Sequence, residues 1–234
     1  VRTGSEFDLV SPKTGEKRGS VDARALFQKL VETRLATGEP YIIFIDHVNS
    51  TMPKHQRELG LKVSTSNLCS EITLPTGTDH LGNDRTAVCC LSSLNFETWD
   101  QWNQDPRFIE DVMRFLDNVL TDYIDRAPQE MARAKYSADR ERSVGLGVMG
   151  LHSFFQARGI PFESAIAKSW NLKMFRHIRS RVDEASMLLA AERGPCPDAA
   201  DRGVMERFSC KMAIAPTASI SIICGGTSAC IEPI

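Results

Sequence analysis

The sequence has no apolar run that approaches the roughly 18 residues needed to span a bilayer. Its opening stretch, VRTGSEFDLV, also lacks the apolar core of a secretory signal peptide. An excess of charge of one sign is missing too, because 28 basic and 30 acidic side chains leave a formal net charge of −2. Non-specific binding of nucleic acid is therefore not expected, and any nucleotide must be held by a local site. We expect a cytoplasmic protein that binds neither a membrane nor DNA.

Cysteine pairs of the kind that bind zinc are absent as well. The seven cysteines include no CxxC motif, and His47, His55 and His80 show no spacing typical of metal ligands. An odd number of cysteines in a chain of 234 residues, which is long enough to bury a core without cross-links, does not indicate a disulfide framework. We expect no bound metal, and reduced thiols among which reactive ones must be identified individually.

Hydrophobic periodicity indicates helices and strands in alternation. A helical period covers residues 21–37, and the apolar run Tyr41–Ile45 after it is typical of a strand buried on both faces. A second strand is expected at Thr86–Phe96, and a third near residues 208–214. Helices are expected at Arg107–Arg126, Val144–Ala157 and Glu163–Arg193. This order is typical of an α/β fold with parallel strands.

The long polar stretch between the first two strands contains the segment STSNLCSEITLPTG. If Asn67–Ile72 is extended, the side chains of Asn67, Cys69 and Glu71 point to the same side. That face offers an amide that can orient a substrate, a reactive sulfur and a general base. A neighbouring carboxylate disfavours a thiolate, so the sulfur suits reaction as S–H or as a sulfur radical. The alternative interpretation is a surface loop with a buried cysteine.

Two other segments have both a chemical and a purely structural interpretation. Cys89 and Cys90 are adjacent in the second predicted strand, so at most one of them shares a pocket with Cys69, and both could be ordinary core cysteines. The segment APTASIS, residues 215–221, combines a predicted helix start with three hydroxyls. Such a turn can bind a phosphate, although the same composition caps a helix.

Gly145, Gly147 and Gly150 spell the G-x-G-x-x-G pattern of dinucleotide-binding folds. The preceding stretch, KYSADRERS, is charged and does not predict the strand that this motif requires. We therefore expect the three glycines to allow close packing of a helix rather than to bind a dinucleotide.

Four segments in order, SNLCSEITLPT, AVCCLSSLNF, SVGLGVMGL and MAIAPTASIS followed by IEP, resemble the catalytic (large, α) subunit of ribonucleotide reductase. The resemblance implies a partial ten-stranded α/β barrel with a central finger loop. Residues 1–234 would be an incomplete segment of the catalytic barrel domain. The finger loop would cover about residues 64–77 and a phosphate-binding turn about residues 215–221.

The resemblance also implies roles for individual residues. Cys69 corresponds to the cysteine that becomes a thiyl radical, Glu71 to the carboxylate that accepts the 3′-hydroxyl proton, and Asn67 to the amide that binds the ribose. Cys89 corresponds to one member of the redox-active pair that ends as a disulfide, whereas Cys90 has no implied role. The substrate's phosphates would be held by Pro216, Thr217, Ala218, Ser219 and Ile220.

The implied activity is the reduction of ribonucleotides, in the form of diphosphates, to 2′-deoxyribonucleotides. The second redox cysteine, the allosteric loops and the radical-relay tyrosines would lie outside this chain, so the chain alone is expected to be inactive. The radical generator would be a dimetal small (β) subunit, as in class I, with adenosylcobalamin, as in class II, as the alternative. Thioredoxin or glutaredoxin would be the external reductant, and the complete protein a homo-oligomer.

Two other functions are compatible with the sequence. One is a different glycyl or thiyl radical enzyme with a related barrel, against which the phosphate-binding segment argues. The other is a non-catalytic nucleotide-binding or regulatory module derived from a reductase.

Overall fold

The structure is a computed structural model that describes residues 3–234, which divide into two units, up to Phe44 and from Ile45. The first unit contains an antiparallel hairpin of β1 (Glu6–Val10) and β2 (Lys17–Asp22), followed by helix α1 (Ala23–Thr37). The predicted helix is confirmed. Its first turn is capped by Asp22, whose carboxylate accepts a hydrogen bond of 2.7 Å from the Ala25 amide, and Gly38 ends it with φ of +78°.

The predicted strand at Tyr41–Ile45 is wrong. Residues 41–44 have no regular secondary structure and are exposed, and Ile45 begins helix α2 (Ile45–Thr51). A strand exists only where a neighbour pairs with its backbone, and no segment among residues 3–234 pairs with this run. An apolar, β-rich composition alone therefore did not determine the local structure.

The second unit is built on two parallel strands, β5 (Leu91–Asn95) and β6 (Gly145–Met149), with Leu94 opposite Val148. All five residues of β6 are buried, as expected of a parallel strand covered on both faces. Residues 210–214 run beside β6. The Leu146 amide donates to the Lys211 carbonyl at 3.0 Å, and the Ala213 amide donates back to the Leu146 carbonyl at 3.4 Å, which is the hydrogen-bond pattern of a parallel pair.

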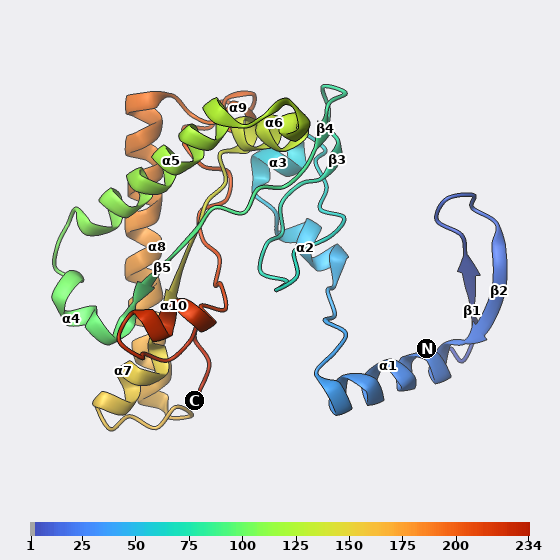
Figure 1. Cartoon of the computed structure of the whole chain (residues 1–234), viewed down its shortest axis with the longest axis horizontal. Helices are drawn as coiled ribbons and strands as arrows, with labels where there is room; N and C mark the ends of the chain where they lie inside the picture. The colour runs from blue at the N-terminus through green and yellow to red at the C-terminus, as the bar shows by residue number, and fades with distance from the viewer. Residues whose placement is uncertain (1–2) are drawn as a thin grey trace. The chain divides into compact units, whose positions relative to one another are not determined.

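Helices connect these extended segments (Figure 1). The β5–β6 connection contains the turn η1 (Phe96–Thr98), α4 (Trp99–Trp102), α5 (Phe108–Arg126), η2 (Gln129–Met131) and α6 (Ala132–Glu141). After β6 come α7 (Leu151–Ala157), α8 (Ala165–Arg193), α9 (Pro197–Ala200) and α10 (Ala218–Ile223). The predicted α/β alternation with parallel strands is thus confirmed for this unit.

Helices α5 and α8 pack against each other and supply much of the core. On α5, the buried residues Ile109, Met113, Leu116 and Leu120 recur at helical spacing and form one stripe. Ser164 caps the start of α8, since its hydroxyl accepts a hydrogen bond of 3.1 Å from the Ala167 amide. No helix within residues 3–234 combines the length and apolar character needed to cross a membrane.

The predicted helix at Val144–Ala157 is only partly correct, because its first half is strand β6 and only α7 is helical. Two of the three glycines explain the difference. A Cβ atom on Gly147 would lie 2.3 Å from the Ala213 carbonyl oxygen, so this glycine lets the strand approach residues 210–214. Gly150 turns the chain from β6 into α7 with φ of +79°, a conformation that favours glycine.

Candidate active site

The finger loop belongs to the second unit. The segments that enter and leave it carry the buried residues Val63 and Leu74. Its base is closed by a hydrogen bond of 2.6 Å between the hydroxyls of Ser64 and Thr76. Asn49 on α2 holds the segment that enters the loop. Its side chain accepts a hydrogen bond from the Val63 amide and donates one to the Val63 carbonyl, both at 2.9 Å. The sequence between 64 and 76 is thus held as a loop by contacts at its two ends.

The tip of the loop is a turn and not an extended strand. The Ser70 amide donates to the Asn67 carbonyl at 3.1 Å, and Ser70 has φ of +65°. The expected alternation of side chains from Asn67 to Ile72 is therefore wrong in its premise, since a turn breaks the two-residue period. At the tip, Leu68 is 90% exposed and Cys69 is exposed as a free thiol.

The turn nevertheless brings Asn67 and Glu71 together. The Asn67 side-chain nitrogen donates to Glu71 Oε2 at 2.8 Å, while Asn67 Oδ1 accepts from the Ile72 amide at 3.1 Å. The Ser66 hydroxyl donates to the Ile72 carbonyl at 2.7 Å. Asn67 therefore bridges the two sides of the turn and orients the Glu71 carboxylate.

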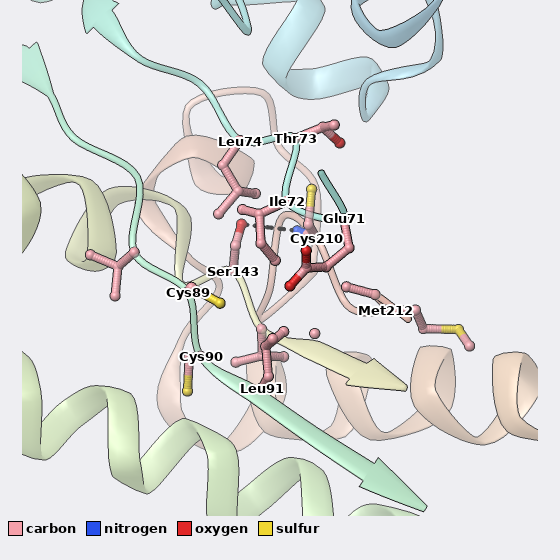
Figure 2. Close-up of a pocket in the computed structure, with 14 residues that line it drawn as sticks. Glu71, Ile72, Thr73, Leu74, Cys89, Cys90, Leu91, Ser143, Cys210 and Met212 are labelled. Atoms are coloured by element: carbon pink, nitrogen blue, oxygen red, sulfur yellow. Dashed lines mark hydrogen bonds between the residues drawn. The ribbon is translucent and has the colours of Figure 1, made fainter. Parts of the chain in front are cut away.

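Cys89 lies in the extended chain just before β5 and faces the same pocket as Glu71 (Figure 2). Burial raises the pKa of the Cys89 thiol, and the nearby Glu71 and Cys69 raise it further. Cys89 is therefore a protonated thiol at neutral pH. Glu71 and Cys89 thus line one pocket, whereas Cys69, at the exposed tip of the loop, is not among the residues that line it.

Cys90 points away from Cys89 toward helix α5 (Figure 2). Its sulfur lies 3.8 Å from the Leu116 carbonyl oxygen, and burial, followed by its neighbour Cys89, raises its pKa. Both cysteines contribute to the pocket wall. Their side chains nevertheless lie on opposite sides of the extended segment before β5, as those of adjacent residues in an extended chain do.

Apart from Cys210, the other lining residues of this pocket lie within the four segments that carry the family resemblance, although the sequence assigned none of them a role. Ser143 lies just before β6 and Cys210 begins the segment that runs beside β6, and the Cys210 amide donates to the Ser143 hydroxyl at 3.2 Å. Burial raises the Cys210 pKa to about 12, with Glu141 contributing, so this thiol too is protonated. The remaining wall comprises Ile72, Thr73, Leu74, Val88, Leu91, Val144, Gly145, Met212 and Ala213.

The predicted phosphate-binding turn lies at the start of α10. Thr217 precedes the helix with φ of +54°, and its buried hydroxyl accepts a hydrogen bond of 2.7 Å from the Cys230 amide. The Ser221 hydroxyl donates to the Ala218 carbonyl at 3.1 Å. Of the three hydroxyls in this turn, only that of Ser219 makes no hydrogen bond within residues 3–234. No lining residue of the Cys89 pocket comes from this turn.

Comparison with known proteins gives a consistent result. The family model described as ribonucleotide reductase, barrel domain, matches residues 4–203. The ribonucleoside-diphosphate reductase large subunit of Invertebrate iridescent virus 3 is 43% identical over 229 residues, which cover 98% of this chain and 35% of that protein. A vitamin B12-dependent ribonucleoside-diphosphate reductase of Mycobacterium tuberculosis is 32% identical over 231 residues, which cover 96% of this chain and 31% of that protein.

Among solved structures, the α subunit of the class Id ribonucleotide reductase of Actinobacillus ureae superimposes with a TM-score of 0.82 and 34% sequence identity. The match covers 90% of this chain and 39% of that one. The chain thus spans about a third of the length of the relatives that it matches. The family and the partial α/β barrel fold expected from the sequence are confirmed. This chain belongs to the ribonucleotide reductase family, and its residues 4–203 match the barrel domain of that family.

Proposed function

We propose that the polypeptide containing this chain reduces ribonucleoside diphosphates to 2′-deoxyribonucleotides, and that the finger loop and Cys89 carry the reaction. The observation that supports this best is that Glu71 and Cys89 line one pocket, next to the turn whose exposed tip carries Cys69. The base and the reducing thiol that the reaction needs thus share a pocket, and we propose that the sulfur for the radical chemistry acts from the adjoining tip of the loop.

In the proposed reaction, the sulfur radical of Cys69 removes the hydrogen atom from C3′ of the ribose. Glu71 accepts the proton of the 3′-hydroxyl, and Asn67 keeps the carboxylate oriented through its 2.8 Å hydrogen bond while binding the ribose. Carboxylate orientation is important because proton transfer requires hydrogen-bond distance to the substrate hydroxyl.

The reduction at C2′ balances with two thiols. The C2′–O bond breaks, its oxygen leaves as water, and a C2′–H bond forms. Cys89 and a second cysteine, which the family resemblance places upstream of this chain, supply two electrons and two protons and become a disulfide. The Cys69 thiol then returns the hydrogen atom to C3′, which regenerates the Cys69 sulfur radical. The raised pKa of Cys89 suits this role, because the thiol must arrive with its proton.

The turn at Pro216, Thr217, Ala218, Ser219 and Ile220 is proposed to hold the substrate's phosphates. Amide groups at the start of α10 and the Ser219 hydroxyl are the donors available there. The Thr217 hydroxyl already accepts a hydrogen bond from the Cys230 amide, so we assign it a role in shaping the turn. The proton of this hydroxyl remains available to donate a hydrogen bond.

The radical generator is proposed to be a dimetal small subunit. The similarity to a class Id α subunit supports this, whereas the similarity to a vitamin B12-dependent enzyme makes adenosylcobalamin the alternative. A thioredoxin-type protein is the proposed reductant of the disulfide, and the complete subunit is proposed to form a homo-oligomer. All seven cysteines are free in the described chain, which favours a reducing compartment such as the cytoplasm.

The test is the substitution Cys69→Ser in the complete polypeptide, assayed with its radical generator. We expect deoxyribonucleotide formation to be abolished while equilibrium dialysis shows unchanged substrate binding. Cys224→Ser, which changes an exposed thiol outside the pocket, is the matched control and should retain activity. Substantial turnover by Cys69→Ser would overturn the assigned role, and a wild-type protein that binds nucleotide without reducing it would instead indicate a regulatory module.

A further inference from the structure

The chain between Glu71 and Cys89 contains a short hairpin that links the finger loop to the extended segment that carries Cys89. After the loop closes at Thr76, strands β3 (Gly77–Thr78) and β4 (Asp84–Arg85) form a two-stranded antiparallel hairpin. A hairpin this short has too few backbone hydrogen bonds to define its own position. Its side chains must therefore anchor it.

Arg85 provides that anchor. Its guanidinium donates to both carboxylate oxygens of Asp198 on α9, at 2.6 and 2.8 Å. Its Nε donates to Asp79 Oδ2 at 3.0 Å, within the hairpin. The Arg85 side chain is 1% exposed and both aspartate side chains are 0% exposed. A bidentate pair of this kind fixes direction as well as distance, because the planar fork matches the carboxylate in one orientation.

A tyrosine on α6 completes the anchor. The Tyr136 hydroxyl donates to Asp79 Oδ2 at 2.8 Å, and the Arg85 guanidinium carbon lies 5.7 Å from the centre of the Tyr136 ring. One residue later, the Thr86 amide donates to the Ser137 hydroxyl at 2.8 Å. The hairpin is therefore attached to α6 and α9 immediately before the chain reaches Cys89.

The carboxylate of Asp79 stays ionised over the working pH range. Burial opposes the ionisation of Asp79, but hydrogen bonds from the Asn83 amide, Tyr136 and Arg85 outweigh it and lower the pKa of Asp79 to about 2. Arg140 donates to Asp198 at 3.0 Å, so that carboxylate is shared by two guanidinium groups. Buried ion pairs are seldom the most stabilising way to fill a core, and their best-attested use is to specify one arrangement.

From these contacts, and on the basis of the function proposed above, we infer that Arg85 is a positioning residue of the reductase reaction. By binding Asp198 and Asp79 together, it fixes the finger loop relative to Cys89. Reduction needs this spacing to be precise, because the substrate sits between Cys69 on one side and Cys89 on the other, and a displacement of about 1 Å can cost about 100-fold in rate.

The test is Arg85→Lys in the complete polypeptide with its radical generator. Lysine keeps the charge but cannot make the bidentate contact. We expect kcat to fall about 10- to 100-fold with the substrate KM unchanged. With 3′-tritiated substrate, tritium released per deoxyribonucleotide formed should rise, because hydrogen abstraction at Cys69 continues while reduction by Cys89 is slowed.

Three further variants separate positioning from folding. Tyr136→Phe removes the hydroxyl bond to Asp79 and the bond that this hydroxyl accepts from the Asn83 side chain of the same hairpin. It keeps the Arg85 contacts, so it should give a smaller change of the same kind, which keeps the test decisive if Arg85→Lys does not fold. Arg133→Ala removes an exposed ion pair of 3.0 Å to Asp84 on the same hairpin and should leave both measurements unchanged. Ile178→Val in the α8 core should lower stability while leaving the kcat of the folded fraction unchanged.

The inference is overturned if Arg85→Lys has the wild-type kcat and tritium ratio. It is also overturned if Ile178→Val, at an equal loss of folded protein measured by near-ultraviolet circular dichroism, changes both values to the same extent. Failure of the proposed function has a different signature, because the wild-type protein then forms no deoxyribonucleotide, and the inference about Arg85 falls with it.

Discussion

The side-chain amide of Asn67 and the carboxylate of Glu71 face each other across a turn, with the amide nitrogen 2.8 Å from Glu71 Oε2. The same Asn67 side chain accepts a hydrogen bond of 3.1 Å from the Ile72 amide, so one residue both closes the turn and orients the Glu71 carboxylate. Asparagine can do this because its side chain carries a donor and an acceptor together. The two functions can therefore be separated by substitution.

Asn67→Asp keeps the acceptor for the Ile72 amide but replaces the donor to Glu71 with a second carboxylate. We expect the loop to keep its conformation while the like charges push the Glu71 carboxylate away, so kcat should fall about 100-fold, the range expected for loss of a positioned base. Steady-state assays of the complete enzyme measure this. Thr65→Ala, at an exposed neighbour, is the control, and wild-type kcat in Asn67→Asp would contradict the arrangement.

Cys89 is expected to become oxidised in a single turnover. When pre-reduced enzyme reacts with substrate in the absence of external reductant, peptide mapping with a thiol-alkylating reagent should find Cys89 in a disulfide. Cys90, whose sulfur contacts the Leu116 carbonyl, should remain alkylatable after denaturation. Cys90→Ser should therefore keep the single-turnover yield, whereas recovery of Cys89 only as a free thiol would refute its redox role.

Structural features that depend on residues close together in the chain are predicted well from the sequence. Helices were expected from periodicity at Arg107–Arg126 and Glu163–Arg193, and α5 and α8 lie within one or two residues of those ranges. The family resemblance identifies the barrel, and it directs attention to Glu71 and Cys89, which do line one pocket. The catalytic roles of those residues remain predictions that the experiments above address.

Long-range contacts and unusual backbone conformations explain what the sequence did not predict. The left-handed conformation of Ser70 is uncommon for serine, so the turn after Asn67 looked extended. Gly145 and Gly147 were expected to allow close packing of a helix, but they lie against Ala213 of an extended segment, a partner that is far along the chain and that no local pattern indicates. Arg85 and Asp198 are 113 positions apart, and no motif links them.

Gly147→Ala tests the close approach of β6 to residues 210–214. The added Cβ would lie 2.3 Å from the Ala213 carbonyl oxygen and 3.3 Å from its carbonyl carbon, so the backbone must shift. We expect the free energy of unfolding to fall by about 1–3 kcal/mol, as for other overpacked sites. Activity should fall as well, because Cys210 and Met212 of the displaced segment line the pocket.

Denaturant unfolding of the complete polypeptide measures this loss. Gly19→Ala is the matched control, since a Cβ at that position meets nothing within 4 Å and its φ is not positive. Equal stability of Gly147→Ala and the wild type would mean that β6 and residues 210–214 are not in contact as described.

Glu141 should make the stability of the fold depend on pH. It is 1% exposed, and burial raises its pKa from 4.5 to about 8, although Arg85 acts in the opposite direction. Below pH 4.5 both the folded and the unfolded chain carry the proton, so folding has no cost from this group. Between pH 4.5 and 8 folding requires uptake of a proton, and the free energy of unfolding therefore falls as the pH rises.

Glu141→Gln removes the ionisation while keeping a side chain of the same shape for its contacts with Gln56 and Ser143. Relative to the wild type, this variant should gain stability between pH 5 and 7.5, by up to about 3 kcal/mol at about 1.4 kcal/mol per pH unit. Denaturant unfolding at both pH values measures the difference. Glu192→Gln is the control, because Arg114 lowers the pKa of Glu192 from 4.5, so this carboxylate is ionised in both states above pH 5 and contributes no pH dependence there. If Glu141→Gln and the wild type lose stability equally over this interval, Glu141 is not a protonated acid in the folded protein.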